Sequence, residues 1–389
     1  MKILVIVSRI PYPLEKGDKL RAYHQVRELS KNHEICLCCL SDQPEHPEAR
    51  EKLREICSEL HIIQLNKAII YLNLLLAWFE SRPFQVAYFH QRKARNAVQS
   101  IIQNFAPDHI YCQLVRTAEY VKNEHSISKT IDYQDAFSKG MARRAERESN
   151  YFKKKFFQTE ARRLIRYEHL IFDYFNNKCI ISEQDKALIF HENQREIAVI
   201  PNGVDMDFFR PMESSPAYDL CFVGNMSYAP NVDSVLYLHN EVMPLVWREM
   251  PDVKVLIAGA TPAEAITRLQ HERFEVGGWF EDIRNAYRQS RLFVAPMQIG
   301  TGLQNKLLEA MAMGIPCITS KLANDALGAT HQQHLMVGST PEDYARQIIA
   351  LLKNPQCGEE LARNARLFVQ QNYTWQSSVV KLEGLFASS

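Results

Sequence analysis

Short apolar runs alternate with helix-length amphipathic segments along the whole chain. Most of these runs are unbroken and rich in Val and Ile, which is typical of parallel strands whose sheets are covered by helices on both faces. The pattern predicts strands at Lys2–Val7, Glu34–Leu40, His61–Gln64, His109–Cys112, Lys129–Ile131, Lys178–Ser182, Glu196–Ile200, Tyr218–Val223, Lys254–Ala258, Phe274–Gly277, Leu292–Pro296, Pro316–Thr319 and His334–Val337.

These strands are too many for one doubly wound sheet, and the pattern restarts after the turn-rich stretch Pro201–Ser215. A chain of 389 residues is long enough for two domains of ordinary size. The predicted fold class is therefore α/β, with two Rossmann-like doubly wound domains facing across a cleft. Ligands of such pairs bind at the carboxyl ends of the strands.

The most informative stretch is a glycine turn at Gly300–Gly302 between a predicted strand and a helix that carries Lys306 and Glu309. Such a turn exposes backbone N–H groups at the positive end of a helix dipole, where anions bind. Lys306 adds a cation, and Glu309, three residues later on the same face, adds an acceptor for sugar hydroxyls. An anion site beside a hydroxyl acceptor indicates a nucleotide ligand.

Composition narrows the function classes. The formal net charge of +1 gives no reason to expect nucleic acid as a partner. No apolar run is long enough to span a bilayer, which needs about 20 residues. The nine cysteines show no metal-ligand spacing, so we predict buried thiols in a reducing cytoplasm and no metal. Asp205-Met206-Asp207 has the form of a metal-binding DxD, but its position after Asn202-Gly203 favours a local turn bond of Asp205.

Two segments depart from the alternating pattern. Residues 67–84 concentrate Ile, Leu, Trp and Phe in a helix-length run, which suits either a core helix or a lip for a lipid-linked acceptor. Residues 139–166 are strongly basic with interleaved Phe and Tyr, which suits either a solvated helix face or docking on anionic lipid headgroups. Peripheral membrane contact through these segments is left open.

Several local motifs occur together at a consistent spacing. They are Pro201-Asn202-Gly203-Val204-Asp205, Phe222-Val223-Gly224-Asn225, Leu256-Ile257-Ala258-Gly259, Val276-Gly277-Gly278-Trp279-Phe280 and the unit from Gly300 to Pro316. This set resembles the family 4 retaining glycosyltransferases of the GT-B fold. The N-terminal Arg9-Ile10-Pro11-Tyr12-Pro13 and Lys16-Gly17-Asp18 are similar to a subgroup associated with exosortase and exopolysaccharide gene clusters.

The resemblance implies roles for individual residues. Glu309 would accept hydrogen bonds from the ribose, and Lys306 with the amides near Leu303 and Gln304 would hold the diphosphate. Thr301 stands where many relatives have a Glu that contacts the donor sugar. The other implied donor-binding residues are Gly17 in an N-terminal glycine loop, Asn225 near the phosphates, Gly278 and Trp279 at the base, and Gly302 in the turn.

Two carboxylates follow a predicted strand of the N-terminal half and are the candidates for catalysis. They are Asp132 and Asp135, for which helix capping is an equal alternative. Gln134-Asp135 is the nearest match to a His-Asp dipeptide of the family.

The resemblance also divides the chain. Residues 1–205, with a C-terminal helix at about 375–389, would bind the acceptor, and residues 206–374 would bind the nucleotide sugar. The predicted function is metal-independent, retaining transfer of a sugar, of the hexosyltransferase type, from a nucleotide-diphosphate sugar to a cell-surface glycan or lipid-linked acceptor. The donor is a substrate, so no cofactor is expected. The expected location is the cytoplasm, with association with the inner face of the membrane left open.

Two alternatives stay open. A nucleotide-sugar epimerase would use the same fold. A non-catalytic nucleotide-sugar sensor would explain why Thr301 and Gln134 stand where sugar-contacting or reactive groups often occur.

Overall fold

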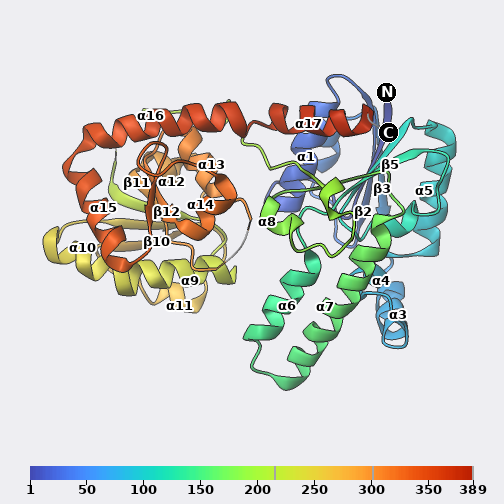
Figure 1. Ribbon diagram of the computed structural model, residues 1–389, viewed down its shortest axis with the longest axis horizontal. Coiled ribbons are helices and arrows are strands. Elements are labelled where there is room, and N and C mark those ends of the chain that lie inside the picture. Colours follow the sequence, from blue (N-terminus) through green and yellow to red (C-terminus); the bar gives the residue numbers. More distant parts are fainter. Residues whose placement is uncertain (214–215, 300–301, 388–389) are drawn as a thin grey trace. The chain divides into compact units, whose positions relative to one another are not determined.

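The computed structural model describes residues 1–213, 216–299 and 302–387. They form two compact units. Unit 1 comprises Met1–Pro201 together with the chain from Ser378 onward, and unit 2 comprises Asn202–Ser377. Both units are layered α/β structures (Figure 1). The chain enters unit 2 inside the turn-rich stretch that interrupts the apolar pattern.

Unit 1 is built on a parallel seven-stranded sheet in the order β3-β2-β1-β4-β5-β6-β7. Its strands are β1 (Lys2–Val7), β2 (Glu34–Ser41), β3 (Glu59–Gln64), β4 (His109–Gln113), β5 (Ser128–Asp132), β6 (Asn177–Ile180) and β7 (Ala198–Val199). Its helices are α1 (Gly17–Leu29), α2 (Ala49–Arg54), α3 (Lys67–Ala77), α4 (Phe84–Phe89), α5 (Arg92–Phe105), α6 (Phe137–Arg147), α7 (Tyr151–Phe172), α8 (Glu183–Lys186) and the end of α17 (Trp375–Ala387), with single turns at Ala118–Tyr120 and Gln194–Glu196.

Alternate side chains of the unit 1 strands point to opposite faces of the sheet, and each face has its own core. On one face Leu4 and Cys38 pack against α4, α5 and α7. On the other face Val5 and Cys39 pack against α1, α2 and the end of α17. Helices α6 and α7 form an antiparallel pair that reaches beyond the sheet (Figure 1).

Unit 2 is built on a parallel six-stranded sheet in the order β10-β9-β8-β11-β12-β13 around one large apolar core. Its strands are β8 (Tyr218–Val223), β9 (Val255–Ala258), β10 (Phe274–Gly278), β11 (Ser290–Ala295), β12 (Cys317–Ser320) and β13 (Met336–Gly338). Its helices are α9 (Ala229–Tyr237), a π-helical turn (Leu238–Val242), α10 (Met243–Glu249), α11 (Glu264–Thr267), α12 (Arg284–Arg288), α13 (Asn305–Ala312), α14 (Lys321–Leu327), α15 (Pro341–Lys353) and α16 (Pro355–Asn372).

The predicted pair of doubly wound parallel sheets is confirmed. Every predicted strand is present, with its ends shifted by two residues or fewer. In each sheet the chain first proceeds toward one edge and then returns to proceed toward the other. The reversal lies between β1 and β4 in unit 1 and between β8 and β11 in unit 2. Such switch points are where doubly wound sheets bind ligands, at the carboxyl ends of the strands.

Candidate functional site

Glycines follow or end three neighbouring strands at the carboxyl edge of unit 2. A Cβ atom at Gly259 would lie 1.7 Å from the carbonyl oxygen of Gly224, and Gly259 has a φ of +145°. Its N–H donates to the carbonyl oxygen of Gly278 at 2.7 Å. A Cβ at Gly224 would lie 2.6 Å from Nδ2 of Asn231 and 3.4 Å from Nζ of Lys306. The backbone therefore approaches closely here because side chains are absent.

Lys306 lies at the switch point of unit 2. Its Nζ donates to Oδ1 of Asn231, lies 3.9 Å from Sδ of Met297, and is 4.7 Å from the centre of the Phe222 ring. An ammonium group has three N–H donors, so among the described residues these contacts leave a donor for a ligand. Desolvation lowers the pKa of Lys306 to about 7, although the charge of Glu309 opposes this change.

The N-terminus of α13 lies directly before Lys306 in the chain. Gly302 has a φ of +102°, in the left-handed region that favours glycine. Gln304 precedes the helix, but no side chain caps it. The first N–H groups of a helix have no partner within it, so in the described residues α13 offers uncapped amides beside an ammonium group. This combination binds anions.

Glu309 lies one turn further along α13 and is held by Tyr287. The Tyr287 hydroxyl donates to Oε2 of Glu309 at 2.8 Å. Desolvation raises the pKa of Glu309, while this hydrogen bond and the charge of Lys306 oppose the rise. No ion pair joins Glu309 to Lys306 among the described residues. The two charged groups therefore do not neutralise each other and can each interact with a ligand.

The other predicted donor residues of unit 2 lie around the same edge. Asn225 is exposed, and its Oδ1 accepts from the N–H of Ser227 at 2.9 Å. Gly278 has a φ of +64° with open space at its Cβ position, and the Trp279 side chain is 66 % exposed. Leu303 packs partly against the core. Thr301 lies outside the described residues.

Gly17, predicted to belong to a glycine loop, is the first residue of α1 in unit 1. A Cβ atom there would meet nothing within 4 Å. Unlike Gly259, this position does not need glycine for packing. A role of Gly17 in donor binding stays a prediction.

Asp132 ends β5 and is fully buried. Its Oδ2 accepts from Nε of Arg21 at 2.6 Å and from the Tyr111 hydroxyl at 2.7 Å. Its Oδ1 accepts from the N–H of Gln134 at 2.9 Å, and Gln134 has a φ of +61°. Both oxygens are thus occupied away from solvent, so the geometry favours a positioning role, in which Asp132 fixes the loop that carries Asp135.

Asp135 lies in that loop with its side chain exposed. Desolvation by the surrounding loops and the charge of Asp185 raise the pKa of Asp135, while Arg116 opposes the rise. Because the side chain is exposed, water screens part of this effect. Of the two predicted catalytic carboxylates, Asp135 is the one that a substrate can reach.

Asp205 makes the expected local turn. Its Oδ1 accepts from the N–H groups of Asp207 and Phe208, both at 3.1 Å.

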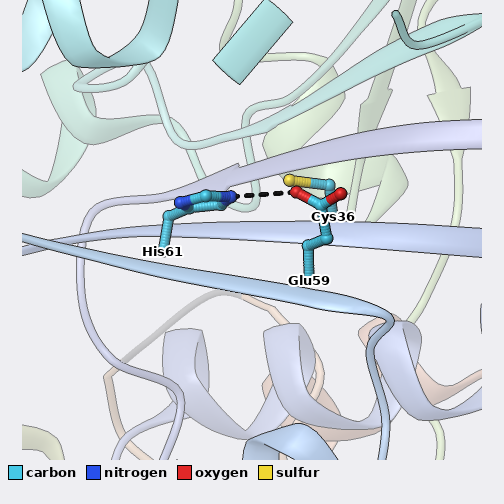
Figure 2. A group of neighbouring side chains, drawn as sticks. All are labelled: Cys36, Glu59 and His61. Carbon is cyan, nitrogen blue, oxygen red and sulfur yellow. Dashed lines mark hydrogen bonds and ion pairs between the residues drawn. The ribbon is translucent and has the colours of Figure 1, made fainter. Parts of the chain in front are cut away.

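Figure 2 shows three neighbouring side chains of unit 1 whose chemistry suits a metal ion. Cys36, Glu59 and His61 offer ligand atoms within 4.8 Å of one another. Nε2 of His61 lies 3.1 Å from Oε2 of Glu59. Spacing along the chain does not indicate this group, because the pairing of Cys36 with Glu59 across β2 and β3 brings it together.

This group is not part of the candidate site. Cys36 and Glu59 belong to the amino-terminal parts of their strands, whereas ligands of doubly wound sheets bind at the carboxyl ends. Burial raises the pKa of the Cys36 thiol, and metal ligation would require its deprotonation. The absence of a metal requirement stays a prediction.

Sequence patterns did not single out the residues that surround the predicted ones. Asn231, Met297 and Tyr287 fix Lys306 and Glu309. These three residues come from separate segments of the chain. Of the three segments, the sequence motifs indicated the one around Asn231, because the Gly224–Asn225 motif lies just before α9.

The two segments that interrupt the alternating pattern lie together in unit 1. Trp78 lies next to Phe84 and Phe156, with ring centres 5.2 and 6.2 Å away. Nη1 of Arg163 donates to the carbonyl oxygen of Ala77 at 2.6 Å. Helix α3 is not a core helix, because only two of its residues are buried.

Large apolar side chains of these segments are exposed at Ile69, Tyr71, Leu72, Leu75, Leu76, Trp78, Phe79, Tyr151 and Phe152. Within the described residues, no helix is both long and apolar enough to cross a bilayer.

Comparison with known proteins finds similarity to sugar-transferring enzymes. Residues 217–354 match the family model described as glycosyl transferases group 1. This range contains most of the glycine-lined edge together with Lys306 and Glu309.

Two relatives and one solved structure extend the comparison. An uncharacterized 44.6 kDa protein in the cps region of Klebsiella pneumoniae is 26 % identical over 96 % of both chains. The UDP-Gal:alpha-D-GlcNAc-diphosphoundecaprenol alpha-1,3-galactosyltransferase of Escherichia coli is 22 % identical over 59 % of this chain and 66 % of its own. The Anabaena protein HepE, solved with UDP and glucose, has a TM-score of 0.70 at 14 % identity and 100 % coverage of both chains.

Proposed function

Since this chain is a glycosyltransferase with the GT-B fold, we propose that it transfers a sugar from a nucleotide-diphosphate sugar to a lipid-linked acceptor in the assembly of a cell-surface glycan. One observation carries the donor assignment. Lys306 and the uncapped start of α13 lie together at the switch point of unit 2, beside glycines at which the backbone approaches closely.

The donor site stabilises the leaving group. When the bond between the sugar C1 and the diphosphate oxygen breaks, its electron pair moves onto the diphosphate, whose negative charge grows. Lys306 and the amides of α13 donate to that charge, which lowers the energy of the transition state more than that of the bound donor. Glu309 accepts from the ribose hydroxyls with the oxygen that Tyr287 leaves free.

We propose that the reaction retains the configuration at C1 and needs no metal ion. The acceptor hydroxyl attacks from the face that the diphosphate leaves, and its proton passes to a diphosphate oxygen. In this scheme the cationic and amide donors of unit 2 take the place of a metal. No pair of catalytic carboxylates is needed, in contrast to a glycosidase.

The acceptor assignment rests on unit 1 and on the relatives. The E. coli relative acts on a diphosphoundecaprenol-linked sugar, and the K. pneumoniae relative is encoded in a cps region. Unit 1 of this chain carries the exposed apolar residues of α3, next to α7 with Lys153, Lys154 and Lys155 near its start. Apolar side chains beside lysines suit the surface of a membrane that contains anionic lipids.

The test is release of nucleoside diphosphate by the purified protein from UDP-, GDP- and dTDP-sugars, with and without a lipid extract of membranes. We expect release from at least one donor that depends on the lipid extract and falls by more than tenfold in Lys306→Met. Donor binding without turnover under every condition would instead indicate a sensor. Release of the nucleoside diphosphate with a free epimer would indicate an epimerase.

A further inference from the structure

Unit 1 contains a pocket of about 270 Å³ that no residue of the donor site lines. Its walls are Arg9, Asp42, Leu74, Phe84, Gln85, Tyr88, Phe89 and Arg116. The pocket thus combines two guanidinium groups and one carboxylate with aromatic and aliphatic side chains.

The pocket lies where a doubly wound sheet binds ligands. Arg9 follows β1, Asp42 follows β2 directly, and Arg116 follows β4. Strands β1 and β4 flank the switch point of unit 1. The pocket therefore occupies in unit 1 the topological position that Lys306 occupies in unit 2.

Arg116 carries a charge that no carboxylate of the described residues neutralises by a direct ion pair. Its Nη2 donates to Oε1 of Gln85 at 2.6 Å, and its Cζ lies 4.8 Å from the ring centre of Phe137 and 5.3 Å from that of Phe89. Its Nε is buried without a hydrogen-bond partner, and no ion pair forms with another described residue. Desolvation and the nearby charge of Arg9 lower the pKa of Arg116 to about 10, so it stays protonated at neutral pH.

The other charged groups of the pocket are already engaged. Nη1 of Arg9 lies 2.5 Å from Oδ2 of Asp18, and the Tyr88 hydroxyl donates to Oδ2 of Asp42 at 2.5 Å. Arg116 is therefore the cation that most needs an anionic partner, since a part-buried charge without one is costly. Its fork of N–H donors matches the oxygens of a phosphate.

The apolar wall of the pocket continues onto an exposed surface. Leu74 belongs to α3. Close to Leu74 in the chain, Tyr71 and Leu75 of α3 and Trp78 just after it are 71 %, 59 % and 59 % exposed. Phe84 packs with Trp78 and begins α4. An amphiphile could thus place an anionic head at Arg116 and an apolar chain along α3.

From this geometry we infer that the pocket binds the diphosphate of an isoprenoid-diphosphate-linked acceptor, with Arg116 on the phosphates and the first isoprene units against Leu74 and Phe84. The inference rests on the proposed function and adds the chemical class of the acceptor. An acidic glycan could supply an anion, but it would leave the apolar wall without a partner.

The binding test uses farnesyl diphosphate as the probe, with pyrophosphate and farnesol as its separate halves. We expect calorimetric binding of farnesyl diphosphate to the wild type, weakened at least tenfold in Arg116→Gln and partly restored in Arg116→Lys. Arg54→Gln is the matched control, because Arg54 is an exposed arginine at the end of α2 whose side chain forms no hydrogen bond or ion pair among the described residues, and it precedes β3 at the other end of the sheet. Equal affinity in all variants, or binding of pyrophosphate as tight as that of farnesyl diphosphate, would overturn the inference.

A second readout separates this inference from the proposed function. In transfer assays, Arg116→Gln should raise the KM for a lipid-linked diphosphate sugar at least tenfold without changing the affinity for the nucleoside diphosphate. If the wild type transfers sugar equally well to an acidic glycan without lipid, the acceptor class is wrong although the transferase assignment stands. If the wild type binds farnesyl diphosphate but transfers no sugar, the proposed function fails and the pocket assignment stands.

Discussion

The carboxyl edges of the two sheets share a topology, but one is formed mainly by backbone atoms and the other by side chains. In unit 2 the edge is mainly backbone, with Gly224 and Gly259 in close approach and Lys306 as its cation. In unit 1 the edge consists of side chains, among them the buried pair of Arg21 and Asp132 and the residues of the pocket that Arg116 lines. The backbone edge of unit 2 fits the diphosphate that nucleotide-sugar donors share, whereas the side chains of the unit 1 edge can be varied to fit both the charged and the apolar part of an acceptor.

The largest expected difference concerns the carboxylates of unit 1. Asp132→Ala should destabilise the protein by about 3–5 kcal/mol, because it leaves the buried guanidinium of Arg21 without its counter-charge. Denaturant unfolding followed by circular dichroism measures this loss.

Asp135→Asn is the control within the same loop. Its stability should stay within about 0.5 kcal/mol of the wild type, because Asp135 is exposed, while its sugar transfer should decrease. A stable Asp132→Ala variant would contradict the positioning role that we assign to Asp132.

The next prediction compares one glycine from each edge. Gly259→Ala should destabilise unit 2 by about 3 kcal/mol, because the added Cβ would overlap the Gly224 carbonyl at a φ that side chains rarely adopt. Gly17→Ala in unit 1 should change the free energy of unfolding by less than about 0.5 kcal/mol, since a Cβ there has open space around it within the described part of the chain. Similar losses from both substitutions would remove the contrast between a backbone edge and a side-chain edge.

A smaller effect follows from the pKa of Lys306, which desolvation lowers to about 7. Above this pH Lys306 of the free protein is mostly deprotonated, whereas a bound diphosphate favours its charged ammonium form. Binding must therefore include uptake of a proton, which costs an amount that approaches about 1.4 kcal/mol for each further pH unit. Nucleoside diphosphate affinity should therefore decline between pH 7 and pH 8.5.

The Lys306→Met variant isolates this contribution, because titration of the ligand phosphate is the same in both proteins. Its weaker affinity should show no such decline over this pH range. Parallel pH profiles for the two proteins would show that Lys306 is not the titrating group.

The smallest expected effect concerns metal ions. Sugar transfer should continue in excess EDTA, because amides and Lys306 supply the positive charge in unit 2. Cys36→Ser should also leave the rate unchanged, since Cys36 lies away from the carboxyl edge of its sheet. Loss of transfer in EDTA that added Zn²⁺ or Mg²⁺ restores would contradict metal independence.

Much of the fold could be predicted because parallel strands buried on both faces form short apolar runs. The runs at Lys2–Val7 and Tyr218–Val223 coincide with β1 and β8 residue for residue. Strand ends were less predictable where a single turn intervenes, as in the predicted run Glu196–Ile200, where only Ala198–Val199 pairs as β7.

The candidate donor site was visible in the sequence because its parts are local. Glycines and the helix of Lys306 and Glu309 occur within short motifs, so their chemistry can be inferred from spacing. The contacts of Asn231 with Lys306 and of Tyr287 with Glu309 could not be predicted from motifs, since these residues meet only after the chain has folded.

The unit 1 pocket was hidden for the same reason. Arg9, Asp42 and Arg116 are far apart in the sequence and meet only because β1, β2 and β4 are neighbours. The burial of Asp132 was also unpredictable, because its partner Arg21 lies 111 residues earlier on α1.

The most direct test of the division between the two edges is a calorimetric titration of nucleoside diphosphates into three variants. Lys306→Met and Glu309→Gln each remove one charged contact of unit 2, and each should weaken binding by about 1–3 kcal/mol. Arg116→Gln changes the unit 1 pocket and should leave the affinity unchanged. Unchanged affinity in both unit 2 variants, or a loss in Arg116→Gln as large as theirs, would contradict the account.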